Sequence, residues 1–221
     1  MPSKLPTCPN GLKLEYTQEG LTLTDGTLSL TADLTESLPR LKQSNLEREL
    51  LVKAARIKGL ERVPRLIDAT AGFGEDSLLL AASGYQVTLF EYDPIIAVLL
   101  EDALDRASKN EMLSGIVSRM KLIQGDSIEA MKSNSLEADV ILLDPMFPER
   151  QKSGLIKKKF QLLQKLESPC SDEKELLEAA LLVKPRKIVI KRPLKGPYLA
   201  GRKPDYSVSG KAIRYDCIYL V

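Results

Sequence analysis

The chain contains no histidine and no tryptophan, and its three cysteines, Cys8, Cys170 and Cys217, lie far apart without a CxxC pair. This cysteine spacing argues against both structural zinc and a disulfide framework, so no metal is expected. The lack of histidine excludes Ser-His-Asp and Cys-His triads and removes the commonest general base. Any chemistry must therefore use carboxylates, backbone groups, tyrosine, lysine or a cofactor.

Long hydrophobic runs are also missing. No apolar stretch approaches the roughly 20 residues that a membrane-spanning helix needs, and residues 1–10 lack the apolar block of a secretory signal. The composition, 43% hydrophobic and 28% charged, is ordinary for a globular protein. We expect a cytoplasmic protein without a membrane segment.

Charge is divided unevenly along the 221 residues. Residues 1–150 hold 16 Lys and Arg against 23 Asp and Glu, whereas residues 151–221 hold 16 against 7. A basic C-terminal part favours a phosphate-rich partner such as a nucleic acid. Solvated lysines on ordinary helix faces are the alternative explanation.

The first 60 residues are predicted to form an N-terminal extension. Residues 12–16, 21–24 and 28–31 alternate between apolar and polar types and are separated by Glu-Gly and Asp-Gly pairs, which predicts short antiparallel strands. Asn45 is expected to cap a helix that continues to Ile57 and ends at Gly59.

Residues 61–221 show short apolar runs alternating with helical segments, the pattern of repeated βα units around a mostly parallel sheet. Two late runs, 206–209 and 213–221, have no helix between them and predict a C-terminal β-hairpin. This is the layout of a Rossmann-like α/β fold of the class I S-adenosylmethionine-dependent methyltransferases rather than of a classical dehydrogenase. The expected strands are 66–69, 86–90, 121–124, 140–143 and 187–190, and the expected helices are 75–83, 94–108 and 174–183.

A strand that runs into a glycine turn and a helix is the sharpest local signal. Gly72 and Gly74 would let the backbone approach a ligand, and Asp68 ends the strand. A dinucleotide site would have a third glycine at position 77, where this chain has serine. Glu75 and Asp76 at the helix start would repel a pyrophosphate and suit the cationic groups of adenosylmethionine, although both acids could simply stabilise the helix dipole.

Further polar residues follow the next two predicted strands. Glu91 can accept both ribose hydroxyls of an adenosine, as also happens in NAD enzymes, and Tyr92 could lie against the adenine or pack in the core. Asp126 and Ser127 could hydrogen-bond the adenine, or Asp126 could simply cap a helix.

The reactive end is predicted at residues 144–148, Asp-Pro-Met-Phe-Pro, directly after the fourth strand. An amine conjugated to a base ring is a poor nucleophile, and acceptors for its N–H groups return electron density to nitrogen. Asp144 and the carbonyl of Pro145 can supply two such acceptors. Phe147 offers a face on which a flipped base can stack.

These motifs resemble those of the bacterial small-subunit rRNA guanine-N2 methyltransferases, the RsmJ family. The resemblance covers roughly residues 39–219 and rests on residues 68–76, 91–94, 143–148, 151–153, 157–158 and 189–193. It implies methyl transfer from S-adenosylmethionine to the exocyclic amine of one guanine in 16S rRNA, free or in the small ribosomal subunit. The cofactor residues that it implies are Glu75, Asp76, Glu91, Tyr92, Asp126, Ser127 and Asp144.

Basic residues in the C-terminal part are candidates to hold RNA phosphates. Three alternatives stay open from sequence: an amino-methyltransferase acting on adenine or cytosine, a nicotinamide-dependent oxidoreductase, and a non-catalytic RNA-binding protein with the same fold. The predicted RNA-binding residues are Lys152, Lys157, Lys158, Lys191 and Arg192.

Overall fold

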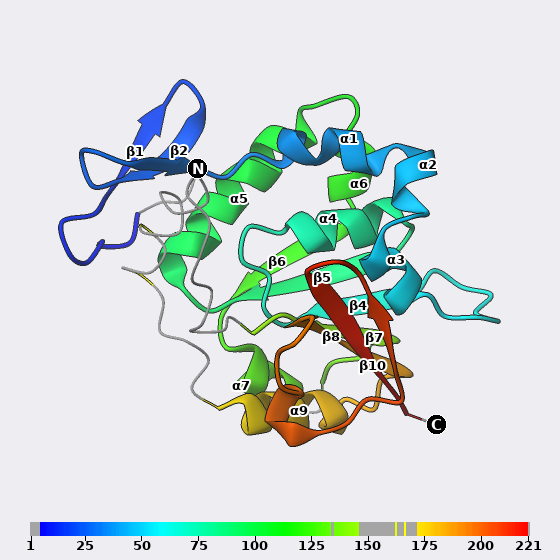
Figure 1. The fold of residues 1–221 in the computed structure, drawn as a ribbon. Coiled ribbons are helices and arrows are strands. Elements are labelled where there is room, and N and C mark those ends of the chain that lie inside the picture. The colour runs from blue at the N-terminus through cyan, green and yellow to red at the C-terminus, as the bar shows by residue number, and fades with distance from the viewer. Residues whose placement is uncertain (1–4, 134, 146–161, 163–165, 167–171, 221) are drawn as a thin grey trace.

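The computed structural model describes residues 5–133, 135–145, 162, 166 and 172–220. In this part of the chain, a seven-stranded sheet has the order β6-β5-β4-β7-β8-β10-β9, and β10 runs antiparallel to both β8 and β9. The remaining pairings are parallel, which confirms the Rossmann-like class with its C-terminal hairpin (Figure 1). The strands are β4 (Arg65–Asp68), β5 (Gln86–Glu91), β6 (Met120–Gln124), β7 (Val140–Leu143), β8 (Lys187–Pro193), β9 (Tyr206–Ser209) and β10 (Ile213–Tyr219).

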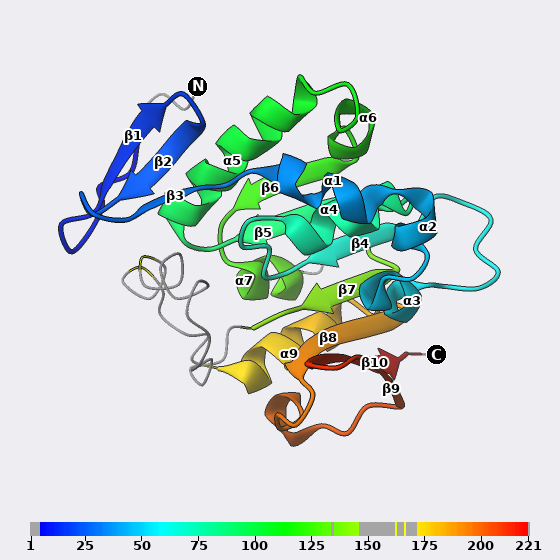
Figure 2. The ribbon, with the colours of Figure 1, turned by 45° about the horizontal axis from the view of Figure 1, so that its top comes forward.

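Helices cover both faces of this sheet (Figure 2). Successive side chains of a strand point to opposite faces. In β7, Val140 and Leu142 pack in one apolar cluster with helix α4 (Glu75–Ala82), while Ile141 and Leu143 pack with α7 (Ser127–Lys132) and α9 (Glu173–Leu182). Because β7 is buried on both faces, its sequence is a continuous apolar run.

Helix boundaries follow from local capping. Helix α5 (Pro94–Ser108) begins at a proline, and the Asp93 side chain accepts hydrogen bonds from the backbone N–H groups of Ile95 and Ile96. The short helix α6 (Ser114–Val117) precedes β6. The Asp93 cap and Pro94 explain why the sequence predicted the start of α5 correctly.

The N-terminal strands form a separate three-stranded antiparallel sheet of β1 (Lys13–Thr17), β2 (Gly20–Thr24) and β3 (Ser29–Thr31). Leucines of this sheet share an apolar cluster with α5. The Asp102 carboxylate on α5 accepts a hydrogen bond from the Leu21 backbone N–H at 3.0 Å. The three-stranded sheet is thus docked on α5, as Figure 1 shows.

The single helix expected from Asn45 to Ile57 is wrong. The structure has two short helices, α2 (Gln43–Leu46) and α3 (Leu50–Ala55), and they follow η1 (Leu34–Ser37) and α1 (Leu38–Leu41). Asn45 lies inside α2 and donates to the Pro39 carbonyl instead of capping. The break comes at Glu49, which is extended at ψ 129° while its carboxylate binds Arg40.

In the described part of the chain, no helix combines the length and apolar character needed to cross a membrane.

Candidate active site

The glycine turn between β4 and α4 contains two glycines with different tasks. Both have positive φ, +54° at Gly72 and +74° at Gly74. A Cβ added at Gly72 would meet no atom of the described residues within 4 Å, whereas one at Gly74 would lie 2.9 Å from a methyl group of Leu100 on α5. Gly74 is therefore needed for close packing against α5, whereas Gly72 borders a space that the described residues leave open to a ligand.

Asp68 is the buried support of this turn. The residue is 2% exposed, and its carboxyl accepts hydrogen bonds from the Ser77 hydroxyl at 2.7 Å and the Thr70 backbone N–H at 3.1 Å. Burial raises the pKa of Asp68 to about 7, although these two hydrogen bonds lower it. Of the predicted cofactor residues, Asp68 thus lies under the turn and shapes it.

Glu91, the last residue of β5, links the turn after β4 to the start of the segment after β5. Its carboxylate accepts the backbone N–H of Gly72 and that of Asp93, each at 2.8 Å, and burial raises its pKa above the usual value. The next residue, Tyr92, is 73% exposed. This exposure excludes a core-packing role for Tyr92 and leaves its ring available to lie against an adenine.

Asp126 caps α7, because its side chain accepts the Ile128 backbone N–H at 2.8 Å. The helix-capping interpretation is therefore confirmed. Ser127 beside it is buried. Glu91 pairs with Gln124 in the β5–β6 register, so Asp126 and Ser127, which follow β6, lie at the same edge of the sheet as Glu91. Their contact with an adenine stays a prediction.

Asp144 and Pro145 follow β7, beside the glycine turn. The Asp144 backbone N–H donates to the Thr70 hydroxyl at 2.7 Å, the Asp144 side chain is 26% exposed, and Pro145 is buried. Thr70 was not among the predicted site residues, although its place in the turn two positions after Asp68 could have suggested it. Phe147 lies outside the described residues.

Lys191 bridges the acid at the start of α4, Asp76, and the acid after β7, Asp144. Its Nζ lies 2.6 Å from Oδ2 of Asp76 and 2.9 Å from Oδ2 of Asp144, and its side chain is 18% exposed. Burial alone lowers the pKa of Lys191, but the neighbouring carboxylates of Asp144 and Asp76 raise it well above its ordinary value. Glu75, the other acid at the start of α4, is exposed.

The geometry does not favour the predicted RNA contacts at Lys191 and Arg192. The Lys191 ammonium forms ion pairs with Asp76 and Asp144. Arg192 is only 1% exposed; its Nε donates a hydrogen bond to the Pro197 carbonyl at 2.8 Å, and its Nη1 donates one to Glu173 at 3.1 Å. Because a phosphate cannot reach a guanidinium buried in this way, Arg192 instead fixes the loop after β8. Lys152, Lys157 and Lys158 lie outside the described residues.

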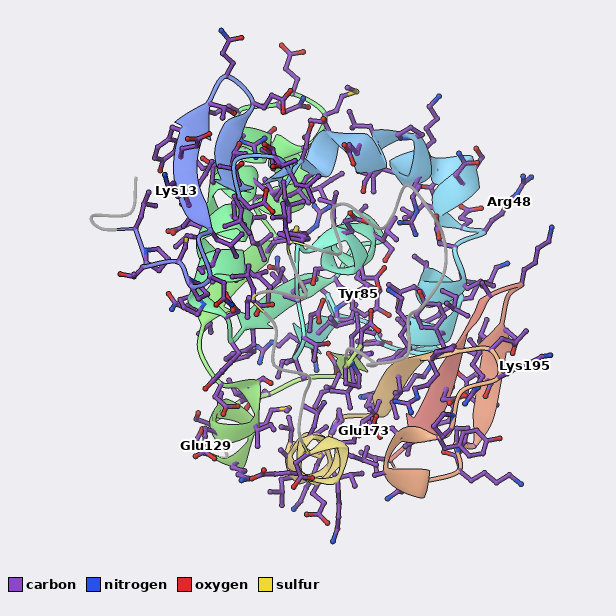
Figure 3. All side chains as sticks on the ribbon, turned by 60° about the vertical axis from the view of Figure 1, so that its left-hand side comes forward. Lys13, Arg48, Tyr85, Glu129, Glu173 and Lys195 are labelled. Carbon is purple, nitrogen blue, oxygen red and sulfur yellow. The ribbon has the colours of Figure 1, made fainter. Side chains whose placement is uncertain are left out.

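The residues present fit S-adenosylmethionine. Open space over Gly72, a carboxylate at Glu91 and an exposed ring at Tyr92 suit a ribose and an adenine, and the acids around Lys191 suit a cationic donor. A group of three His, Cys, Asp or Glu residues able to hold a metal ion does not occur within the described ranges. Figure 3 shows the side chains on the ribbon.

The sheet order, the glycine turn, Glu91 at the end of β5 and Asp144 directly after β7 together define a class of protein, the Rossmann-like methyltransferases that use S-adenosylmethionine.

Comparison with known proteins specifies the family. A family model described as "Putative SAM-dependent methyltransferase" matches residues 6–221. The ribosomal RNA small subunit methyltransferase J of Pseudomonas paraeruginosa is 45% identical over 169 residues, which is 76% of this chain and 64% of that protein. The protein of the same name from Thioalkalivibrio sulfidiphilus is 42% identical over 179 residues, 80% of this chain and 70% of that protein.

A solved structure agrees with these relatives. The crystal structure of the SAM-dependent methyltransferase NGO1261 from Neisseria gonorrhoeae is 30% identical with a TM-score of 0.77, covering 99% of this chain and 86% of that chain. The chain therefore belongs to the family of SAM-dependent methyltransferases that includes the ribosomal RNA small subunit methyltransferase J proteins. The match confirms the resemblance seen in the motifs, and it spans 64% of the length of the Pseudomonas paraeruginosa relative.

Proposed function

We propose that this protein transfers a methyl group from S-adenosylmethionine to the exocyclic N2 amine of a guanine in 16S ribosomal RNA. The observation that carries the proposal is the placement of Asp144, which the Thr70 hydroxyl and the Lys191 ammonium hold at the end of β7 beside the glycine turn. The names of the relatives, which specify small-subunit ribosomal RNA, support this substrate class.

The cofactor would be held along the carboxyl ends of β4, β5 and β6. Glu91 would accept the ribose hydroxyls, and Tyr92 would cover the adenine, with Asp126 and Ser127 at its edge. Gly72 leaves room for the donor, and Glu75 and Asp76 give its cationic groups a negative environment. Bound S-adenosylmethionine supplies an electrophilic methyl group on a sulfonium.

The protein's own residues would act on the guanine amine. Asp144 accepts one N–H of the amine, and the carbonyl of Pro145 accepts the other, which restores electron density to nitrogen and fixes its direction of approach. As the new bond forms, Asp144 takes up or relays the proton that nitrogen loses. Phe147 would stack on the flipped base.

The RNA would lie along the basic C-terminal part of the sequence. Lys152, Lys157 and Lys158 are the proposed phosphate contacts, which would make binding depend on salt. Either naked 16S rRNA or the small ribosomal subunit would serve as substrate, and this substrate would place the activity in the cytoplasm.

Methyl transfer from S-adenosylmethionine with a tritiated methyl group tests this proposal. Small ribosomal subunits lacking the modification, naked 16S rRNA and duplex DNA of mixed sequence are offered in parallel. We expect label in ribosomal RNA alone. Label in DNA alone would support the second candidate, an amino-methyltransferase of adenine or cytosine, because an acid followed by proline suits any conjugated amine.

A further inference from the structure

The bridge made by Lys191 is a consequence of strand register. Leu143, the last residue of β7, pairs with Ile190 in the parallel β7–β8 ladder, so Asp144 and Lys191 follow the last paired residues. Figure 2 shows β7 and β8 side by side. The first turn of α4 brings Asp76 to the same ammonium. Three elements that are distant in sequence thus meet at one nitrogen atom.

The surroundings of this ammonium are mainly acidic. Asp76 and Asp144 contact it directly, and both also raise the pKa of the nearby buried Asp68, although burial is the larger cause. Tyr215 on β10 pairs with Lys191 in the ladder, and burial together with the two acids keeps its pKa above the usual range. Arg40 adds a more distant positive charge from the N-terminal extension.

We propose that Lys191 is a positioning residue for methyl transfer, whose ammonium holds Asp144 as an ionised, fixed acceptor and balances the charge of Asp76 beside the donor. The proposal rests on the proposed function for its kinetic consequences. Its consequences for cofactor binding are the same whichever RNA is the substrate.

The role of the Lys191 bridge follows from where the electrons and the proton go during methyl transfer. The donor's S–CH₃ bond breaks with its electron pair remaining on sulfur, and the lone pair of the guanine amine forms the N–CH₃ bond. The nitrogen becomes positively charged and loses one proton to Asp144 or, through it, to water. Only an ionised Asp144 can attract that charge and accept that proton, and an adjacent ammonium favours the ionised form.

The same ammonium also adjusts the affinity for the donor. S-adenosylmethionine carries a sulfonium charge that its product, S-adenosylhomocysteine, lacks. Near Asp76 and Asp144, Lys191 would repel this extra charge, which weakens binding of the donor relative to the product. A lysine that merely stabilised the fold would affect both ligands alike.

Calorimetry on three variants tests the binding consequence at pH 8. In Lys191→Met, we expect the affinity ratio of S-adenosylmethionine to S-adenosylhomocysteine to rise by about 10-fold, since one positive charge is removed. Lys191→Arg keeps the charge and should keep the ratio. Lys109→Met is the matched control, because Lys109 also pairs with an aspartate but lies exposed on the protein surface next to α5. An unchanged ratio in Lys191→Met would overturn the proposal.

Kinetics on the RNA substrate test the second consequence. For Lys191→Met we expect kcat to fall by about 100-fold with little change in KM for RNA, and the acidic limb of the pH–rate profile to move to higher pH. Lys191→Arg should recover most of the rate. A rise in KM alone would instead make Lys191 a phosphate contact, and an unshifted profile with equal losses in both variants would make it purely structural.

Should Lys191→Met not fold, the double variant Lys191→Met/Asp76→Asn keeps the local charge balance. The acidic limb of its pH–rate profile should still lie at higher pH than that of the wild type, because Asp144 lacks the ammonium 2.9 Å from its carboxylate. The displacement should be smaller than the loss of Lys191 alone would cause, because removing the Asp76 carboxylate offsets part of it. An unshifted limb would contradict the proposal. A wild-type protein that methylates no RNA would refute the proposed function, while the ligand-affinity ratio would still decide the role of Lys191.

Discussion

The Ser77 hydroxyl donates a 2.7 Å hydrogen bond to Oδ2 of Asp68, and both side chains are buried beneath the glycine turn. A dinucleotide-binding fingerprint would have its third glycine at position 77, and a glycine could not make this bond. The turn is therefore built around a buried carboxyl and its hydroxyl partner. This arrangement accounts for the serine at position 77 and so explains why the glycine pattern is incomplete.

Stability should fall with rising pH because of Asp68. Its folded-state pKa of about 7 lies above the ordinary 3.8, so between these values the folded protein holds a proton that the unfolded chain releases. The free energy of unfolding should then decrease as pH rises through this window, by up to about 4 kcal/mol. Urea unfolding at pH 5 and pH 8 should show a smaller decrease for Asp68→Asn than for wild type. An equal decrease in both would show that Asp68 is not the group responsible.

Loss of the Glu91 carboxylate should weaken cofactor binding. In Glu91→Gln, an amide replaces the charged acceptor proposed for the ribose hydroxyls, so the dissociation constant for S-adenosylhomocysteine should rise by about 10-fold to 100-fold. Calorimetry measures this, with thermal unfolding to check that the loops at Gly72 and Asp93 stay in place. Glu101→Gln, an exposed change on α5, is the control. Unchanged affinity in Glu91→Gln would remove Glu91 from the site.

Lys187 should be structural rather than functional. It is 1% exposed, and its Nζ donates to the carbonyls of Ala54 at 2.9 Å and Arg56 at 2.6 Å, which ties the end of α3 to β8. Lys187→Met leaves both carbonyls without this donor and should lower the free energy of unfolding by about 2–5 kcal/mol. Denaturant unfolding tests this against Lys174→Met, whose lysine is exposed. A loss of similar size in the control would contradict the interpretation.

The proposed phosphate contacts should be visible in the salt dependence of RNA binding. Replacing Lys152, Lys157 and Lys158 together with alanine removes three cations, so the slope of log K against log salt should become shallower by about 2–3. Fluorescence anisotropy with a labelled RNA fragment measures this slope. Affinity for S-adenosylhomocysteine should not change. An unaltered slope would show that these three lysines do not contact RNA phosphates.

Much of the fold could be predicted because its signals are local. The run Val140–Leu143 gave the bounds of β7 correctly, and the Asp93-Pro94 pair marked the start of α5. The helix predicted from Asn45 failed for the opposite reason. Its break at Glu49 accompanies a pairing with Arg40, a contact that helical periodicity does not reveal.

The candidate site could be predicted only in part, because some residues depend on register. Glu91 and Asp144 come directly after predicted strands, and parallel strands bring their carboxyl ends to one edge of the sheet. The sequence did not show that Lys191 stands next to Asp144 or that Arg192 turns inward to Glu173. A basic pair directly after a predicted strand is typical of a phosphate contact, and only the neighbouring elements show that acids of the protein bind Lys191 and Arg192 instead.

Nucleoside analysis of the methylated RNA tests the central claim most directly. Small ribosomal subunits without the modification are incubated with the protein and S-adenosylmethionine, and the 16S rRNA is digested and separated by liquid chromatography with mass spectrometry. We predict a single new product, N2-methylguanosine, which is absent when Asp144→Ala replaces the wild type. A methylated adenine or cytosine instead, or undiminished N2-methylguanosine from Asp144→Ala, would contradict the account.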